Sequence, residues 1–272
     1  MIILKIGGSI LTKKDSAEPE VDYDNLNRIA SEIEDSLKIE NITSDLNDGL
    51  ILIHGAGSFG HPPADKYKIN DPINDEEYPY KRLGFAEIQN QVKKLNSIIC
   101  DVLIEHNIPV VALPPSAFIT TDNKRVFNIN LKLIKKYLDE GYIPVLYGDI
   151  VLDESLKMAI ISGDQVLQYI SKILNSDSII LGTDVDGVYN KNPKKHDDAK
   201  LINVLSSIEQ IEFLESTNNI DVTGGMVGKV NELLSLTNLG IESCIVNANT
   251  PGIIANALQS KEFKGTLIKK EE

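Results

Sequence analysis

Cysteine is scarce in this chain: Cys100 and Cys244 are the two present among 272 residues, and they lie far apart in the sequence. Each stands among apolar residues, so the sequence offers neither a disulfide framework nor a clustered zinc site. Two isolated cysteines are typical of a protein that works in a reducing compartment. We therefore expect a cytoplasmic protein that has no metal ligands of its own.

Positive charge is also in short supply, since 27 Lys and Arg stand against 40 Asp and Glu and give a formal net charge of −13. Nucleic acids and anionic membrane surfaces are bound by basic faces, so this balance argues against both as partners. No apolar run approaches the about 20 residues of a membrane span. The chain starts with the strand-like Ile2-Ile3-Leu4 and no basic leader, so we expect it not to be exported.

Apolar, β-branched runs alternate with segments of helical periodicity along the chain. The runs that predict strands are Ile2–Ile6, Leu50–His54, Pro109–Leu113, Ile143–Val151, Ser178–Leu181 and Ser243–Asn247. The segments that predict helices are Asn25–Leu37, Gly84–Glu105, Leu131–Leu138, Gln165–Leu174 and Met226–Leu239. This alternation predicts an α/β fold, a three-layer αβα sandwich around a mostly parallel sheet. Asp149–Ile161 departs from it and predicts a hairpin, the hinge between two lobes sharing one sheet.

Two glycine turns, each following an apolar run, are the strongest local signals. The first is Gly7-Gly8-Ser9 after Lys5, and the second is Gly55–Gly60 with His61 directly behind it. Small residues let backbone N–H groups approach an anion closely, and a helix that begins after the turn adds partial positive charge. We expect the two turns to bind two phosphate groups.

The second turn also matches the dinucleotide fingerprint G-x-G-x-x-G, which raises the alternative of a nicotinamide or flavin enzyme. That fingerprint requires a full helix after the turn, then a second strand that ends in an acidic residue. Here Pro62-Pro63 and the acidic loop Asp71–Tyr80 follow instead. The context argues against a dinucleotide site, and the P-loop pattern is absent altogether.

Three further segments place glycine beside a carboxylate or a lysine: Ser162-Gly163-Asp164, Thr183–Tyr189 and Asp221–Lys229. Together with Lys5–Ser9 they resemble the amino acid kinase family of ATP-dependent kinases, which have no P-loop. The resemblance covers essentially the whole chain. It implies one domain over residues 1–272, with an N-terminal lobe of about 1–150 for acceptor phosphate and dimerisation and a C-terminal lobe of about 151–272 for the nucleotide.

Within that family, His61-Pro62, Pro115–Ala117 and Tyr147–Asp149 are most similar to the isopentenyl phosphate kinases of archaea. The resemblance implies phosphorylation of isopentenyl phosphate to isopentenyl diphosphate by ATP with Mg²⁺, in isoprenoid biosynthesis through an alternative mevalonate pathway. It also implies a homodimer.

The resemblance assigns catalytic roles to five residues: Lys5, Lys14, His61, Asp164 and Lys229. The acceptor oxygen is already ionised near pH 7, so the enzyme has to neutralise two anions rather than remove a proton. Lysine suits this as a compact positive charge. By resemblance, Lys5 and Lys229 contact the β- and γ-phosphates and Asp164 holds these lysines in position. Lys14 is implied to stabilise the transition state, and the His61 ring to bond the acceptor phosphate.

The phosphate and nucleotide contacts implied by the resemblance are mostly backbone groups and loop residues. N–H groups of Gly7, Gly8 and Ser9 are expected on the transferring phosphoryl group, and those of Gly55, Ala56 and Gly163 on the acceptor, beside Gly60 and Ser162. The nucleotide is expected near Ala56, Thr183, Asp184, Asp186, Gly187, Val188, Tyr189, Lys191, Pro193, Lys194, Gly225 and Met226. We interpret Asp184 and Asp186 as turn and ribose residues, because Mg²⁺ is held largely by ATP oxygens and water.

An apolar stripe with steps of three and four residues predicts one helix face: Phe85, Ile88, Val92, Leu95, Ile99 and Val102. We expect Phe85 and Ile88 to contact the prenyl tail, helped by Tyr78, Tyr80 or Phe118, and the later residues to serve core or dimer contacts. We interpret His54 as structural and His106 and His196 as surface residues.

The residues leave two other functions open. A fosfomycin-type phosphonate kinase would share the fold and the histidine, and it is closer than a uridylate kinase. A regulatory nucleotide-binding module is the non-enzymatic alternative, but it would be expected to lose the catalytic lysines and aspartate, which are all present here. Ala56 stands where many relatives have glycine, so its backbone must suit a Cβ atom.

Overall fold

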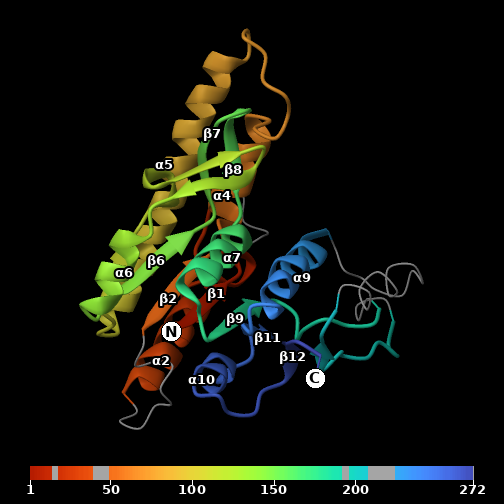
Figure 1. Ribbon diagram of the computed structural model, residues 1–272. Helices are drawn as coiled ribbons and strands as arrows, with labels where there is room; N and C mark the ends of the chain where they lie inside the picture. Colours follow the sequence, from red (N-terminus) through yellow and green to blue (C-terminus); the bar gives the residue numbers. More distant parts are fainter. Residues whose placement is uncertain (14–17, 39–48, 192–195, 208–223, 272) are drawn as a thin grey trace.

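The computed structural model describes residues 1–13, 18–38, 49–191, 196–207 and 224–271 (Figure 1). Within these residues, eight strands form the main sheet in the order β10-β12-β11-β9-β1-β2-β6-β3. They are β1 (Ile2–Ile6), β2 (Leu50–His54), β3 (Val110–Ala112), β6 (Ile143–Tyr147), β9 (Ser178–Thr183), β10 (Val204–Leu205), β11 (Glu242–Asn247) and β12 (Gly265–Ile268). The pairs are parallel except β11–β12. The mostly parallel sheet of the prediction is confirmed.

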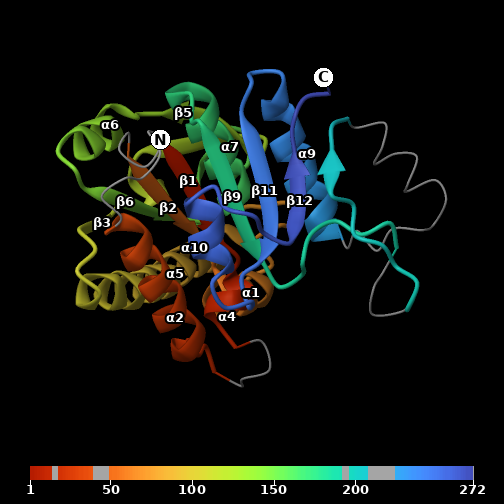
Figure 2. The same ribbon diagram turned by 90° about the horizontal axis from the view of Figure 1, so that it is seen from below.

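Helices cover both faces of this sheet, as Figure 2 shows. On the face of Ile2, Leu4 and Ile6 lie α2 (Tyr23–Leu37), α5 (Tyr78–Glu105) and α10 (Ile253–Leu258). On the face of Ile3 and Ile51 lie α6 (Lys132–Asp139), α7 (Gly163–Leu174) and α9 (Gly224–Thr237). Every residue of β1 and β2 is buried, as parallel strands covered on both sides require. The three-layer αβα sandwich is therefore confirmed. None of the helices among the described residues is both long and apolar enough to cross a membrane.

A second, smaller sheet was not predicted as a unit. Its order is β5-β4-β7-β8, from β4 (Ile119–Asp122), β5 (Arg125–Ile129), β7 (Asp149–Asp153) and β8 (Lys157–Ile161), with the short η1 (Pro115–Ala117) before it. The expected hairpin is present as antiparallel β7 and β8. The single strand predicted over Ile143–Val151 is wrong, because the chain breaks at Gly148 and β7 leaves the main sheet to pair with β8.

The helix after the second glycine turn was also missed. α4 (Gly57–Lys66) contains both Pro62 and Pro63, which we read as helix breakers. Two prolines remove two backbone donors, but Phe59 and Ala64 of α4 are buried, and α4 packs along α5, so tertiary packing outweighs the local penalty. The dinucleotide reading still fails, because α4 is followed by the helix α5 and not by a strand.

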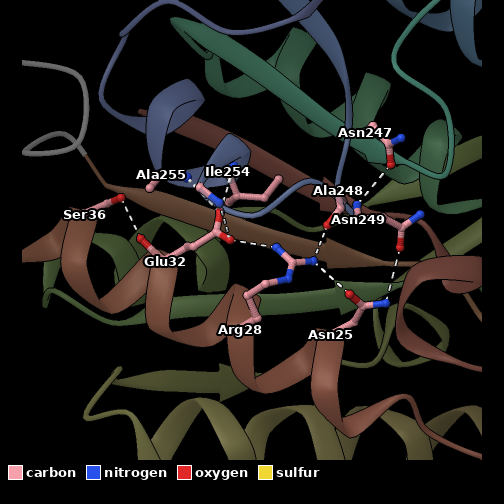
Figure 3. Close-up of polar contacts among 10 residues, drawn as sticks. Asn25, Arg28, Glu32, Ser36, Asn247, Ala248, Asn249, Ile254 and Ala255 are labelled. Carbon is pink, nitrogen blue, oxygen red and sulfur yellow. Dashed lines mark hydrogen bonds and ion pairs between the residues drawn. The ribbon is translucent and has the colours of Figure 1, made fainter.

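Polar side chains of α2, in the N-terminal half of the chain, bind the start of α10 in the C-terminal half (Figure 3). The buried Glu32 of α2 accepts hydrogen bonds from the backbone N–H groups of Gly252, Ile254 and Ala255 at 2.9, 3.0 and 3.3 Å. Arg28, one turn earlier, pairs with Glu32 at 2.7 Å and donates to the carbonyl oxygen of Ala248. One carboxylate of the N-terminal half thus accepts from the N–H groups at the start of α10 that have no acceptor within the helix.

Candidate active site

The two glycine turns lie in direct backbone contact. β1 and β2 are parallel neighbours, so their carboxyl ends meet at one edge of the sheet. A Cβ atom on Gly8 would lie 2.4 Å from the backbone nitrogen of Gly57, and one on Gly55 would lie 2.4 Å from that of Gly8. Only glycine permits this approach. The structure therefore places the two turns that were predicted to bind phosphate side by side.

Thr12, which the sequence did not single out, ties the two turns together. Its hydroxyl donates to the carbonyl oxygen of Gly8 at 2.8 Å and accepts from the backbone N–H of Ser58 at 3.0 Å. One side chain thereby links α1 (Gly8–Leu11) to α4. α1 is a single turn, so its dipole adds less charge than the sequence-based argument assumed.

Two of the backbone N–H groups that were expected to bind phosphate already donate to carbonyl oxygens of the protein. The N–H of Gly7 donates to the carbonyl oxygen of Gly182 at 2.8 Å, and that of Gly55 donates to Ile6 at 3.0 Å. This corrects the prediction that both N–H groups face phosphate. Gly8, Ser9 and Gly163 lie in first turns of helices, where N–H groups have no acceptor within the helix. Ala56 caps α4 with φ −74°, so its Cβ causes no strain.

The charged centre of the site consists of one carboxylate between two lysines. Asp164 lies 2.7 Å from the Lys5 ammonium and 3.3 Å from that of Lys229, through different carboxylate oxygens. β1 carries Lys5, α7 carries Asp164 and α9 carries Lys229. Ser162 caps α7 in a capping box with Gln165, which fixes the first turn that presents Asp164.

Burial and neighbouring charges shift the pKa values of Asp164 and Lys5. Burial opposes ionisation of Asp164, but the two lysines outweigh it, so its pKa lies below the ordinary value. Desolvation lowers the pKa of Lys5, whose side chain is 4 % exposed, against the opposing effect of Asp164. The glycine at position 163 leaves room for the Lys5 side chain, because a Cβ there would lie 3.0 Å from Cε of Lys5.

The two histidines near the second turn have different environments. His61 is exposed on α4. His54 is buried, stacks on Tyr147 and has ring contacts of 3.0 Å to the Gly55 carbonyl oxygen and 3.1 Å to Asn96. Burial lowers the pKa of His54 to about 4, so it is neutral at pH 7. This environment agrees with the structural role expected for it.

The remaining histidines lie away from the glycine turns. His106 contacts Glu34 at 3.2 Å, and its side chain is partly covered rather than freely exposed. His196 is exposed, as expected.

The predicted nucleotide residues gather at the ends of β9 and β11. Asp186 accepts from Tyr189 at 3.0 Å and from Asn247 at 2.9 Å, and it pairs with Lys264. The Thr183 hydroxyl donates to the carbonyl oxygen of Val185 at 2.9 Å, which closes the turn.

Three other predicted nucleotide residues are held within the protein. Val188 is buried in the core, its N–H donates to the Thr266 hydroxyl at 2.8 Å, and its carbonyl oxygen accepts from the Ile202 N–H at 2.8 Å. Gly187 allows close packing, because a Cβ there would lie 2.5 Å from the Thr266 hydroxyl. Lys191 pairs with Asp198. Asp184 is exposed.

Several predicted residues cannot be placed around this site. Lys14, Pro193 and Lys194 lie outside the described residues, while Gly225 is the second residue of α9 and Met226 packs against the core. In the part of the chain that the structure describes, no group of three or more His, Cys, Asp or Glu could hold a metal.

An apolar cluster extends from the second turn between α4, α5 and the β7–β8 hairpin. We call it the α4–α5 cluster; it contains Ala64, Tyr67, Ile69, Ile88, Val92, Tyr147, Ile150 and Met158, with Ala56, Ile73, Tyr78, Phe85 and Ile160 packed against it. Ile88 belongs to this cluster and Phe85 packs against it, and their contact with a prenyl tail stays a prediction. Val92 belongs to the same cluster, whereas Leu95 lies in the main core. Phe118 packs on the other face of the main sheet. Tyr80 is exposed and its ring lies against Tyr67.

Comparison with known proteins identifies the family of the chain. The model of the amino acid kinase family matches residues 1–247. The chain belongs to the amino acid kinase family.

Two family relatives are similar over nearly their whole length. An isopentenyl phosphate kinase of Methanothermobacter thermautotrophicus is 51% identical, with 98% of each chain covered. One of Methanocaldococcus jannaschii is 38% identical, also with 98% of each chain covered. A solved structure of an isopentenyl phosphate kinase superposes with a TM-score of 0.87 at 48% identity, and the match covers 99% of this chain and 100% of that one. Kinases of the amino acid kinase family use ATP and small-molecule substrates, and this holds for the present member.

Sequence reasoning missed some residues that shape this amino acid kinase site. Asn247 and Lys264 hold Asp186, and Thr12 holds the two turns. Asn247 could have been found, because it ends a predicted strand at the same sheet edge as Gly7 and Gly55. Thr12 and Lys264 carry no local signal, since their partners are remote in sequence.

Proposed function

We propose that this member of the amino acid kinase family transfers the γ-phosphoryl group of ATP to isopentenyl phosphate and forms isopentenyl diphosphate. The observation that carries the proposal is the Lys5–Asp164–Lys229 centre beside two abutting glycine turns. It is supported by full-length relatives that are isopentenyl phosphate kinases.

The proposed chemistry follows from charge. Bringing ATP and a phosphate monoester together concentrates negative charge, and two ammonium groups offset it. Asp164 pairs with both lysines, so its role in the proposal is to position them rather than to touch the phosphoryl group. A carboxylate aimed at that group would repel it.

The phosphate and the apolar tail of the proposed acceptor each have suitable surroundings near the second glycine turn. His61 is exposed on α4 beside the second turn, where its ring could donate to the acceptor phosphate. Ala56 belongs both to that turn and to the α4–α5 cluster, so a phosphate held at the turn places an attached apolar tail at the cluster, next to Phe85 and Ile88. This arrangement favours a prenyl phosphate over UMP or an amino acid as acceptor.

We also infer that Mg²⁺ accompanies ATP, that the enzyme is a cytoplasmic homodimer, and that residues about 1–150 bind the acceptor while about 151–272 bind the nucleotide. Magnesium keeps several water ligands and binds mainly through substrate phosphates, so it needs no protein cage. The proposal also keeps Lys14 as a residue that stabilises the transition state and Pro193 and Lys194 as nucleotide contacts, and these three lie outside the described residues.

The decisive test is Mg²⁺-dependent ADP release with isopentenyl phosphate, run beside fosfomycin, UMP and N-acetylglutamate. We expect strong turnover on isopentenyl phosphate alone. Preferred turnover on fosfomycin would replace the acceptor and keep the kinase chemistry. ATP binding without turnover on any acceptor would favour a regulatory module.

A further inference from the structure

Lys81 of α5 is almost fully buried, and its ammonium is bound by backbone carbonyl groups. Its side chain is 2 % exposed, and its ammonium donates to the backbone carbonyl oxygens of Lys68, Asp71 and Pro72 at 2.8, 2.9 and 3.3 Å. An ammonium has three N–H groups, so these oxygens use its full donor capacity. Lysine is seldom buried to this degree without such partners.

The three oxygens belong to one segment, the connection between α4 and α5. That connection also supplies Ile69 to the α4–α5 cluster and Ile73 to its edge. Ala56 precedes α4 and Ile69 follows it, and the ten residues of α4 span about 15 Å at 1.5 Å per residue. The connection therefore closes the cluster at the end away from the phosphate turn, where Figure 1 shows it near the β7–β8 hairpin.

A second attachment holds the same segment from outside. Lys157 of β8 lies 4.3 Å from the centre of the Tyr78 ring and 3.4 Å from the Asp75 carboxylate. Lys157 and Asp75 are both exposed, so this ion pair contributes less than the buried ammonium.

We propose that Lys81 is a positioning residue for the acceptor. Its ammonium acts as an internal cation that turns three carbonyl groups inward and fixes residues 68–72 as the closed wall of the α4–α5 cluster. The wall then determines how tightly a short apolar tail is held and excludes longer ones. This inference rests on the proposed function, because it assigns the α4–α5 cluster to the acceptor tail.

The test compares Lys81→Met, which keeps the length of the side chain and removes the N–H donors, with Lys94→Met, an exposed lysine of the same helix. Hydrogen exchange is measured over residues 68–77, and KM is measured for ATP, isopentenyl phosphate and geranyl phosphate. We expect faster exchange in this segment alone in Lys81→Met. We also expect about a tenfold higher KM for isopentenyl phosphate, the order of effect of losing a charged hydrogen-bond donor, with KM for ATP unchanged. The preference for isopentenyl over geranyl phosphate should fall, and Lys94→Met should match the wild type.

Lys157→Met provides a second variant whose folding is not at risk, because the Lys157 side chain is exposed. It should shift the exchange and the acceptor preference in the same direction by a smaller factor. Unchanged exchange in Lys81→Met, or faster exchange with an unchanged acceptor preference, would overturn the inference while the kinase assignment stands. If Lys81→Met does not fold, an unchanged acceptor preference in Lys157→Met overturns it. A wild-type enzyme that phosphorylates no prenyl phosphate would overturn the proposed function first, and the inference with it.

Discussion

Asp164 lies between two lysines, one from the strand β1 and one from the helix α9. Lys5 is nearly inaccessible and Lys229 is partly exposed, yet both ammonium groups lie within 3.3 Å of one carboxylate. Two cations this close repel each other unless an anion lies between them. In the proposed function, the carboxylate holds the lysines in position for the phosphates, so that they need not rearrange during transfer.

Asp164→Asn should reduce kcat on the order of a hundredfold, the effect of removing one preorganised electrostatic group from an active site. The fold should persist, since the side chain keeps its shape. Steady-state kinetics with circular dichroism measures both, and Asp101→Asn, an exposed change on α5, serves as the control. A kcat within twofold of the wild type would remove Asp164 from the positioning role.

His61→Ala should raise the KM for isopentenyl phosphate or lower kcat by about ten- to a hundredfold, the range for losing a hydrogen bond to a charged group. Because His61 is exposed, the melting temperature should barely change. His196→Ala is the matched control for an exposed histidine. Near-normal activity in His61→Ala would exclude this residue from acceptor binding.

At the scale of elements, the turns of the small sheet depend on one buried carboxylate. Asp153 accepts hydrogen bonds from the backbone N–H groups of Lys124 at 2.9 Å and Leu156 at 2.8 Å, and from the Thr121 hydroxyl at 2.8 Å. Burial opposes its ionisation, but these bonds prevail and lower the pKa of Asp153 below its usual value. The carboxylate thereby joins the β4–β5 turn to the β7–β8 turn.

Asp153→Asn should lower the free energy of unfolding by about 2 kcal/mol at pH 7, since it removes a charged acceptor from a buried set of donors. Because the folded-state pKa is depressed, the stabilisation is complete above the unfolded value of about 3.9 and is lost as pH falls through the folded one. Urea unfolding between pH 7 and pH 3 measures this. A difference between variant and wild type that grows as pH falls would contradict the assignment.

The attachment of α2 to α10 also depends on one residue. Glu32→Gln replaces one acceptor oxygen by an amide donor that faces the N–H groups of α10, so we expect a loss of about 1–3 kcal/mol in unfolding free energy. Asp35→Asn, exposed on the same helix, should have no effect. Equal stability of the two variants in urea would show that Glu32 does not hold the two halves together.

The elements that the sequence predicted well are those with strong local periodicity. β1 and β2 end where predicted, and the apolar stripe of α5 lies inward. Features that depend on distant partners were missed. Tertiary burial stabilises α4 across two prolines, and after Gly148 the strand β7 joins a second sheet, of which the sequence predicted the β7–β8 hairpin but not β4 and β5. The N–H groups of Gly7 and Gly55 bond to Gly182 and Ile6, which no local rule could reveal.

At the scale of the whole molecule, the candidate active site lies at the carboxyl ends of the strands of the main sheet. The carboxyl ends of β1, β2, β9 and β11 bring together residues from both halves of the chain, and ligands of open parallel sheets bind at such edges. The distribution of charge agrees with this location of the site. The protein carries a formal charge of −13, yet two of its lysines are placed where phosphates are expected.

The most direct test of the account is a ³¹P NMR spectrum of the protein with ATP, Mg²⁺ and isopentenyl phosphate. We predict that ADP and a diphosphate ester form in equal amounts as the monoester signal declines, and that Asp164→Asn suppresses both. ADP accompanied by inorganic phosphate, with the isopentenyl phosphate signal unchanged, would contradict the account, because the two glycine turns would then not hold donor and acceptor together.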